Sequence, residues 1–180
     1  MIISKWQSLS PVQQFLTKII VSVIAWKWVY VSFLQPIRVP DRWLTILITQ
    51  KTAAVINWLN PSKIAAHVVI NDAEKAAYPV RGSQYLIGIY DGCNGLELIL
   101  MYAALIAFLP YPFKRQLVFI CLGAFVLFWV NVFRCVALQW IYVNHQSLFE
   151  TTHHYLFTLV FYAFIFLGWY LFVQKKPSLS

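Results

Sequence analysis

Apolar residues occur in four long runs along this chain, separated by short polar or proline-containing segments. The runs cover residues 15–34, 96–109, 117–142 and 153–173. A helix that crosses a bilayer takes about 20 mostly apolar residues, so these runs predict membrane helices. The connection 110–116 holds two prolines, a lysine and an arginine, which predicts a tight basic loop between antiparallel spans.

The segment 43–59 is harder to place because its apolar and polar positions are mixed. Its polar residues include three threonines, Gln50 and Lys51, which predicts a helix with one wet face. Two interpretations stay open: an outer interfacial or re-entrant helix, or a poor second span. A cytoplasmic amino terminus favours the first, because the later spans then keep their orientation.

Residues 60–90 form a polar stretch that predicts a small cap outside the membrane. Alternating residues at 67–70 and 84–90 indicate short strands or a hairpin. The stretch is too short to bury a core of its own. The predicted fold is an all-α integral membrane helical bundle of about four to six membrane helices. We expect one domain, 1–180, whose extracytoplasmic cap at 60–90 contains the short β-hairpin.

Composition supports a membrane protein. Of the 180 residues, 61% are hydrophobic and 11% are charged, against about half and a quarter in soluble domains. The net charge is +8, from 14 Lys and Arg against 6 Asp and Glu. Because most of the basic residues flank the apolar runs, they are interpreted as orientation signals and contacts with membrane lipid. A nucleic-acid partner is not predicted.

The same charges predict which side of the membrane each loop faces. Basic pairs stand at 114–115 and 175–176, two spans apart. The positive-inside rule makes both pairs cytoplasmic, in a multi-pass protein of the cell inner (cytoplasmic) membrane. Three consecutive antiparallel spans then bring Cys93, Arg134 and the pair His153-His154 to the outer leaflet. Connectivity therefore predicts one extracytoplasmic site.

Cys93 is the candidate nucleophile of this site. It lies in a polar turn just before the run 96–109. Cysteine reacts as the thiolate, which helix amino termini and cations stabilise. We expect Asp91 or Asn94 to cap the helix, with backbone N–H groups facing the sulfur. Glu97 would oppose a thiolate unless it is paired. The alternative is an inert cysteine in a tight turn.

Arg134 is the candidate positive group. An arginine inside an apolar run costs at least about 2.5–3.5 kcal/mol on insertion scales, so it must pair or line a polar cavity. Asn131 stands three residues earlier, on the same helical face. The alternative is a structural ion pair of Arg134 with Glu97 or Glu150.

His153 and His154 are candidate acid–base groups at the start of the last run. A histidine beside a cysteine can act as general base and then as general acid. The alternative is an interfacial histidine pair without chemistry. A metal site is less favoured, because the spacing is not His-x-x-x-His and only His67 could fold over to join the pair. No metal or other cofactor is predicted.

These motifs together resemble the exosortase/archaeosortase family, and the short chain resembles the compact members found in Bacteroidetes. The turn Cys93-Asn94-Gly95 is similar to the family's Cys-small-Gly turn, although many members have Ser at the position of Asn94. Residues 131–134 resemble its Asn-x-x-Arg motif. Residues 153–155 resemble its His motif, and the doubled histidine leaves both as candidates.

The resemblance implies a membrane cysteine transpeptidase or protease. It implies a catalytic set of Cys93, Arg134, His154 and His153, with Asn94, Gly95, Asn131 and Glu97 as supporting residues. The implied substrate is a secreted protein with a carboxy-terminal sorting signal, made of a short motif, a transmembrane helix and a basic tail. A Cys93 thioester would be passed to an acceptor at the outer face of the membrane.

Two other classes of protein stay open. The polar residues could serve only to hold helices together in a non-enzymatic membrane scaffold or polysaccharide-export accessory protein. A channel or transporter is less favoured, because no internal repeat is visible in the sequence.

Overall fold

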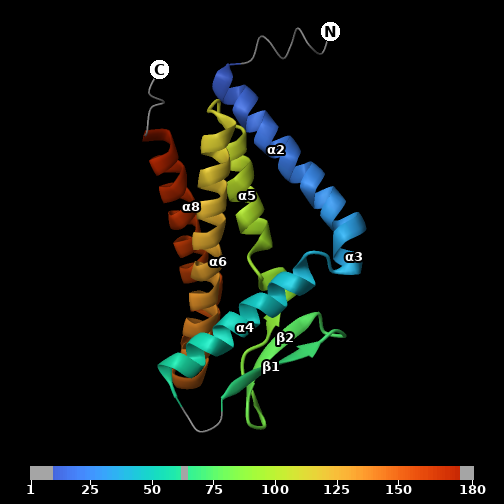
Figure 1. Ribbon diagram of the computed structural model, residues 1–180, viewed down its shortest axis with the longest axis vertical. Helices are drawn as coiled ribbons and strands as arrows, with labels where there is room; N and C mark the ends of the chain where they lie inside the picture. Colours follow the sequence, from blue (N-terminus) through green and yellow to red (C-terminus); the bar gives the residue numbers. More distant parts are fainter. Residues whose placement is uncertain (1–9, 62–64, 175–180) are drawn as a thin grey trace.

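The computed structural model describes residues 10–61 and 65–174, which form a mainly helical molecule with a small sheet at one end (Figure 1). Three helical segments are long and apolar enough to cross a membrane: Val12–Ile37, Phe113–Asn144 and Gln146–Gln174. A further apolar helix, Leu96–Ala107, is shorter. The predicted membrane helical bundle with a small β cap is confirmed.

The first membrane helix diverges from the rest of the bundle in Figure 1. It consists of α2 (Pro11–Val29), the π-helical turn η1 (Tyr30–Leu34) and α3 (Gln35–Ile37). It starts before the predicted 15–34 because Ser10 and Gln13 form a capping box. In that box each side chain accepts a hydrogen bond from the backbone N–H of the other.

Three helices pack side by side to form the body of the molecule: α5 (Leu96–Ala107), α6 (Phe113–Asn144) and α8 (Phe157–Gln174) (Figure 1). At about 1.5 Å per residue, α5 is much shorter than α6. Their shared core contains Tyr102, Ile106, Leu127, Phe161, Ile165 and Phe172.

Tyr102 fixes how closely these three helices approach. Its ring is 2% exposed, and its hydroxyl donates to the carbonyl of Phe119 at 3.0 Å. A Cβ at Gly123 would lie 2.0 Å from the ring, and one at Gly168 would lie 2.9 Å from it. Glycine at both positions therefore makes room for the ring between α6 and α8.

Helix α4 (Asp41–Leu59) runs across the end of the bundle (Figure 1). The predicted wet face is found only at Gln50 and Lys51, which are exposed; Thr45, Thr49 and Thr52 are at most 1% exposed. A threonine can be buried when its hydroxyl has a partner: Thr49 Oγ1 donates to Thr45 O at 2.7 Å, and Thr45 Oγ1 donates to Asp91 Oδ1 at 2.8 Å. Of the described helices, α4 is not one that is long and apolar enough to cross a membrane. Its position across the end of the bundle agrees with the interfacial interpretation.

The cap is an antiparallel sheet packed against α4. Its strands are β1 (Ala66–Asn71), β2 (Ala76–Arg81), β3 (Gln84–Tyr85) and β4 (Ile89–Tyr90); β1, β3 and β4 each pair with β2. The predicted strands at 67–70 and 84–90 are found, the second split in two. The sequence did not predict β2, because its residues do not alternate and include a proline.

The chain between α6 and α8 differs from the prediction. Residues 143–152 were expected to form a loop, but helical structure begins again at η3 (Gln146–Leu148) and continues through α7 (Phe149–Thr151) into the π-helical turn η4 (Thr152–Leu156). Most polar residues of this segment are exposed, whereas Glu150 lines a cavity, and η4 carries both candidate histidines.

Candidate active site

Cys93 ends a short 3-10 turn, η2 (Asp91–Cys93), that directly follows β4. As the predicted run 96–109 implies, α5 begins at Leu96, and Gly95 is its N-cap, so Cys93 lies three residues before the helix. Gly95 has a φ of 78°, which disfavours other residues. A Cβ there would also lie 3.2 Å from Asn131 Nδ2.

The predicted capping roles of Asp91 and Asn94 need correction. Asn94 Oδ1 accepts a hydrogen bond from Leu96 N at 2.9 Å, whereas Asp91 pairs with an arginine. No hydrogen bond reaches the sulfur of Cys93 among the described residues. The expected backbone donors to the sulfur are therefore not found, and the turn itself positions the thiol.

The backbone carbonyl of Cys93 is bound by both polar members of the α6 motif. Arg134 Nη2 donates to it at 2.8 Å and Asn131 Nδ2 donates at 3.4 Å. The two side chains reach one atom because residues three apart share a helical face. Asn131 is 1% exposed. The Asn-x-x-Arg spacing thus connects α6 to the candidate nucleophile.

Arg134 forms no ion pair within the described part of the chain. The two carboxylates predicted as alternative partners are taken: Glu97 pairs with Lys27 at 2.8 Å, and Glu150 with His154 at 3.2 Å. Arg134 Nε is buried without a hydrogen-bond partner. Its guanidinium instead has the carbonyl of Cys93 and the face of the Phe161 ring, 5.7 Å from the ring centroid.

The two histidines lie next to each other in η4, with ring centroids 4.9 Å apart. His153 is half-buried and stacks on Phe149 at 5.7 Å. His154 is more exposed, and its Nε2 pairs with Glu150 Oε2. The geometry therefore gives each histidine one property of a general base: His153 is shielded from solvent, and His154 has a carboxylate that orients its ring.

Helix α4 and the residues just before it hold the Cys93 turn on both sides of Cys93. On one side, Arg38 Nε donates to Asp91 Oδ2 at 2.7 Å and Thr45 Oγ1 donates to Asp91 Oδ1 at 2.8 Å. On the other side, Asn94 Nδ2 donates to Asp41 Oδ1 at 2.9 Å. The pair with Asp91 raises the pKa of the Arg38 guanidinium. The turn is therefore held from α4 as well as from α6.

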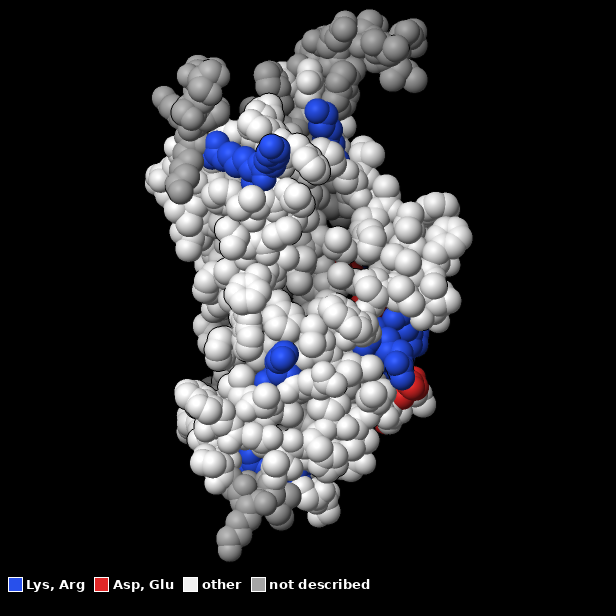
Figure 2. All heavy atoms as spheres, in the orientation of Figure 1, with Lys and Arg blue, Asp and Glu red and all other residues white. Residues whose placement is uncertain are grey.

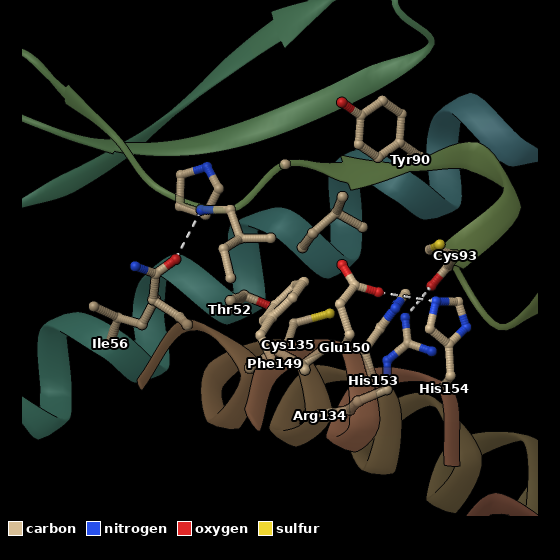
Figure 3. A pocket seen from close by; sticks show the side chains of 16 residues that line it. Thr52, Ile56, Tyr90, Cys93, Arg134, Cys135, Phe149, Glu150, His153 and His154 are labelled. Carbon is tan, nitrogen blue, oxygen red and sulfur yellow. Dashed lines mark hydrogen bonds and ion pairs between the residues drawn. The ribbon is translucent and has the colours of Figure 1, made fainter. Parts of the chain in front are cut away.

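A cavity of about 290 Å³ brings the candidate catalytic residues together (Figure 3). Cys93, Arg134, His153 and His154 all line it. The predicted supporting residues do not line it. Asn94, Gly95 and Glu97 instead line a neighbouring cavity of about 120 Å³ that also reaches Cys93 and Arg134. Asn131 binds the carbonyl of Cys93, and Glu97 pairs with Lys27.

Several residues in and around the site were not predicted from the sequence. Gln139 Oε1 accepts a hydrogen bond from Ile87 N at 2.7 Å and so ties the strand segment to α6. A helical stripe could have revealed it, since positions 131, 134, 135, 138 and 139 follow the i, i+3, i+4, i+7, i+8 pattern. Arg38 and Asp41 gave no such signal, because they lie in a segment that the sequence marks only as a proline-containing break.

The described residues contain no group of three or more His, Cys, Asp or Glu side chains arranged to hold a metal ion. The fold is that of a membrane protein, and one cavity brings together a thiol, a guanidinium and two imidazoles.

The chain belongs to the transmembrane exosortase family (Exosortase_EpsH), whose model matches residues 6–171. Membership suggests a membrane transpeptidase of the cysteine type. Comparison with curated proteins and with solved structures gave no match.

Proposed function

We propose that this protein is a cysteine transpeptidase or protease that cleaves a carboxy-terminal sorting signal of secreted proteins at the outer face of the membrane. The observation that carries the proposal is the cavity that Cys93, Arg134, His153 and His154 share. Family membership supports the same chemistry. The substrate carries a short motif, a transmembrane helix and a basic tail.

In the proposed reaction, the Cys93 thiolate attacks a peptide carbonyl and forms a C–S bond. His153 or His154 takes the thiol proton and then gives it to the leaving amine as the C–N bond breaks. The product is a thioester on Cys93. An amine or another acceptor then attacks the thioester, releases the thiolate and completes the transfer.

Arg134 is proposed to stabilise the oxyanion that forms during both steps. A donor that reaches a developing negative charge in a site shielded from water lowers the barrier strongly. Its guanidinium is suited to this role, since no carboxylate neutralises it among the described residues and its Nε has no partner. Its contact with the Cys93 carbonyl keeps it beside the nucleophile.

The proposed location is the inner membrane, with the site on the extracytoplasmic side. In Figure 2, basic residues lie toward the two ends of the visible face, and the belt between them is mostly uncharged. The basic pair 114–115 lies at the start of α6, at the end of the bundle opposite the cavity. The second basic pair, 175–176, lies outside the described residues.

Trapping the acyl intermediate tests this proposal. A candidate secreted protein with a carboxy-terminal helix and basic tail is incubated with the full chain in membranes, and Cys93 is analysed by mass spectrometry. We expect an adduct with the mass of the upstream fragment, and none in Cys93→Ala. A non-enzymatic scaffold or export accessory protein would bind such a chain without forming the adduct.

A further inference from the structure

The cavity that holds Cys93 is polar toward the catalytic candidates and apolar farther along α4 and α6 (Figure 3). Leu138 lies one helical turn beyond Arg134, and Ile56 lies one turn beyond Thr52, about 6 Å along each axis. The apolar part is lined by Ile56, Pro79, Ile87, Leu138 and Phe149. Three helices and the sheet contribute to it.

We propose that this apolar part, the apolar subsite, binds a bulky uncharged side chain of the substrate peptide next to the carbonyl that Cys93 attacks. The inference rests on the proposed function, because it assigns a side-chain preference to the same peptide. It makes Ile56, Leu138 and Phe149 specificity-determining residues, and the substrate class is a peptide with a large aliphatic residue at the cleavage point.

Charge and burial support this occupant. No residue that lines the apolar subsite carries a charge, and Leu138 is 4% exposed. Two polar side chains line the cavity beside this part: Gln139, whose Oε1 is already occupied by Ile87 N at 2.7 Å, and Thr52, which has one buried hydroxyl without a partner. A charged side chain would lose water there without an ionic partner, and an amide would find few partners for its polar atoms, whereas an aliphatic side chain gains free energy from the area it buries.

The path of the chain beside the cavity supports binding of the substrate peptide in an extended conformation. Ile87, Gly88 and Ile89 line the cavity, and β4 continues directly into η2, which ends at Cys93. A peptide that follows this strand is led to the thiol. The volume of about 290 Å³ is several times that of one water, about 30 Å³, so a side chain and the adjoining carbonyl both have room.

Peptide vinyl sulfones test the proposal without a known substrate. Three probes of the form acetyl-Ala-Ala-Xaa vinyl sulfone carry Leu, Asn or Asp at Xaa; Leu and Asn have similar shapes. The Cys93 thiolate adds to the terminal vinyl carbon, the electron pair of the double bond takes a proton, and nothing leaves. The full chain in lipid nanodiscs is sampled over time, and the Cys93 adduct is quantified by peptide mapping.

We expect the Leu probe to modify Cys93 about tenfold faster than the Asn probe or more, and the Asp probe to be slowest. Ile56→Asp should remove this preference: once each rate is divided by the same variant's rate with iodoacetamide, which has no side chain, the Leu and Asn probes should react about equally. If Ile56→Asp does not fold, Ile56→Phe should shift the preference from Leu toward an Ala probe. Trp58→Ala, at a residue on the same helix that is 80% exposed, is the matched control.

Equal rates with the three probes, or a preference that both Ile56 variants retain, would overturn the apolar subsite. Reaction of Cys93 with iodoacetamide but with no vinyl sulfone would overturn it as well. Failure of the proposed function has a different signature: secreted substrates give no acyl intermediate, while the order of the three probe rates is still measurable.

Discussion

At the scale of single residues, Arg134 constrains the site most. A guanidinium inside a membrane segment is costly and needs polar partners. Here its described polar contact is a backbone carbonyl, that of Cys93, at 2.8 Å. A carbonyl orients the guanidinium without neutralising it, so the positive charge stays available for an anion that forms beside the thiol.

Replacing Arg134 by Gln should slow formation of the Cys93 acyl intermediate by about 10²–10³-fold, because an oxyanion donor and its charge are lost. The rate is measured by mass spectrometry with the wild-type protein as reference. Arg42→Gln is the matched control, since Arg42 is half-exposed and pairs with Asp72 on the surface. An Arg134→Gln protein that acylates at the wild-type rate would contradict the oxyanion role.

The two histidines can be separated by parallel alanine variants. We expect one of His153→Ala and His154→Ala to lower the acylation rate by about 10²–10⁴-fold, the usual contribution of a general base. If His154 is the base, Glu150→Gln should lower the rate as well, because Glu150 orients its ring. His145→Ala serves as the control, because His145 does not line the cavity. Full activity in both His153 and His154 variants would exclude histidine as the base.

The sequence could predict which catalytic candidates meet but not what holds them. Cys93, Arg134 and the histidines open or close successive spans, so antiparallel connectivity alone brings them to one level. Their supports come from farther away: Arg38 and Asp41 reach the Cys93 turn from a break between helices. Contacts between such distant segments depend on tertiary packing, which hydropathy and spacing do not encode.

At the scale of secondary-structure elements, α4 is the platform of the site. Its buried positions Asp41, Leu44, Thr45, Ile48, Thr49, Thr52 and Ala53 follow helical spacing and form one face. This face contacts the Cys93 turn, α6 and the sheet. Of the threonines that suggested a wet face, Thr45 binds the turn, and Thr49 bonds to the backbone of its own helix.

Breaking the contacts that hold the Cys93 turn against α4 and the residues just before it should destabilise the protein. Arg38 and Asp91 form an ion pair in which both side chains are about nine-tenths buried. Removing one partner of such a pair costs about 3–5 kcal/mol, so Arg38→Ala should lower the melting temperature in nanodiscs clearly. Arg42→Ala, in a largely exposed pair with Asp72, should cost about 1 kcal/mol or less. Equal melting temperatures for the two variants would show that the Arg38 pair does not hold the turn.

Elements with a regular pattern were predictable, and elements defined by pairing were not. The apolar runs gave α6 and the last span, and alternation gave β1. Strand β2 lacks alternation and contains Pro79, yet it is the central strand because three others pair with it. The helical turns at 146–152 looked like a loop because they are short and carry mostly polar, exposed side chains.

At the scale of the whole molecule, the short helix α5 is consistent with the proposed position of the site at a membrane boundary. Twelve residues rise about 18 Å, less than the roughly 30 Å of a hydrocarbon core. The chain leaves the membrane body before α5 and returns through the Cys93 turn, with α4 and the sheet covering that end (Figure 1). The cavity is therefore enclosed by the cap on one side and by α6 and the last span on the other.

The orientation of the molecule gives a prediction for intact cells. A membrane-impermeant maleimide should modify Cys93 in spheroplasts, because the proposed orientation places the site on the extracytoplasmic side. A cysteine placed at Phe113 in a Cys93→Ser background should react only after the membrane is permeabilised. Labelling in the reverse order would place the cavity on the cytoplasmic side and contradict the positive-inside assignment.

The central claim is that Cys93 forms the covalent intermediate, and processing of a secreted reporter in membranes tests it most directly. The reporter carries a short motif, a transmembrane helix and a basic tail, and it is expressed with wild-type protein or with Cys93→Ala. We predict a shortened reporter with the wild type and full-length reporter with Cys93→Ala, at equal levels of the membrane protein. A Cys93→Ala protein that still shortened the reporter would contradict a covalent role for Cys93.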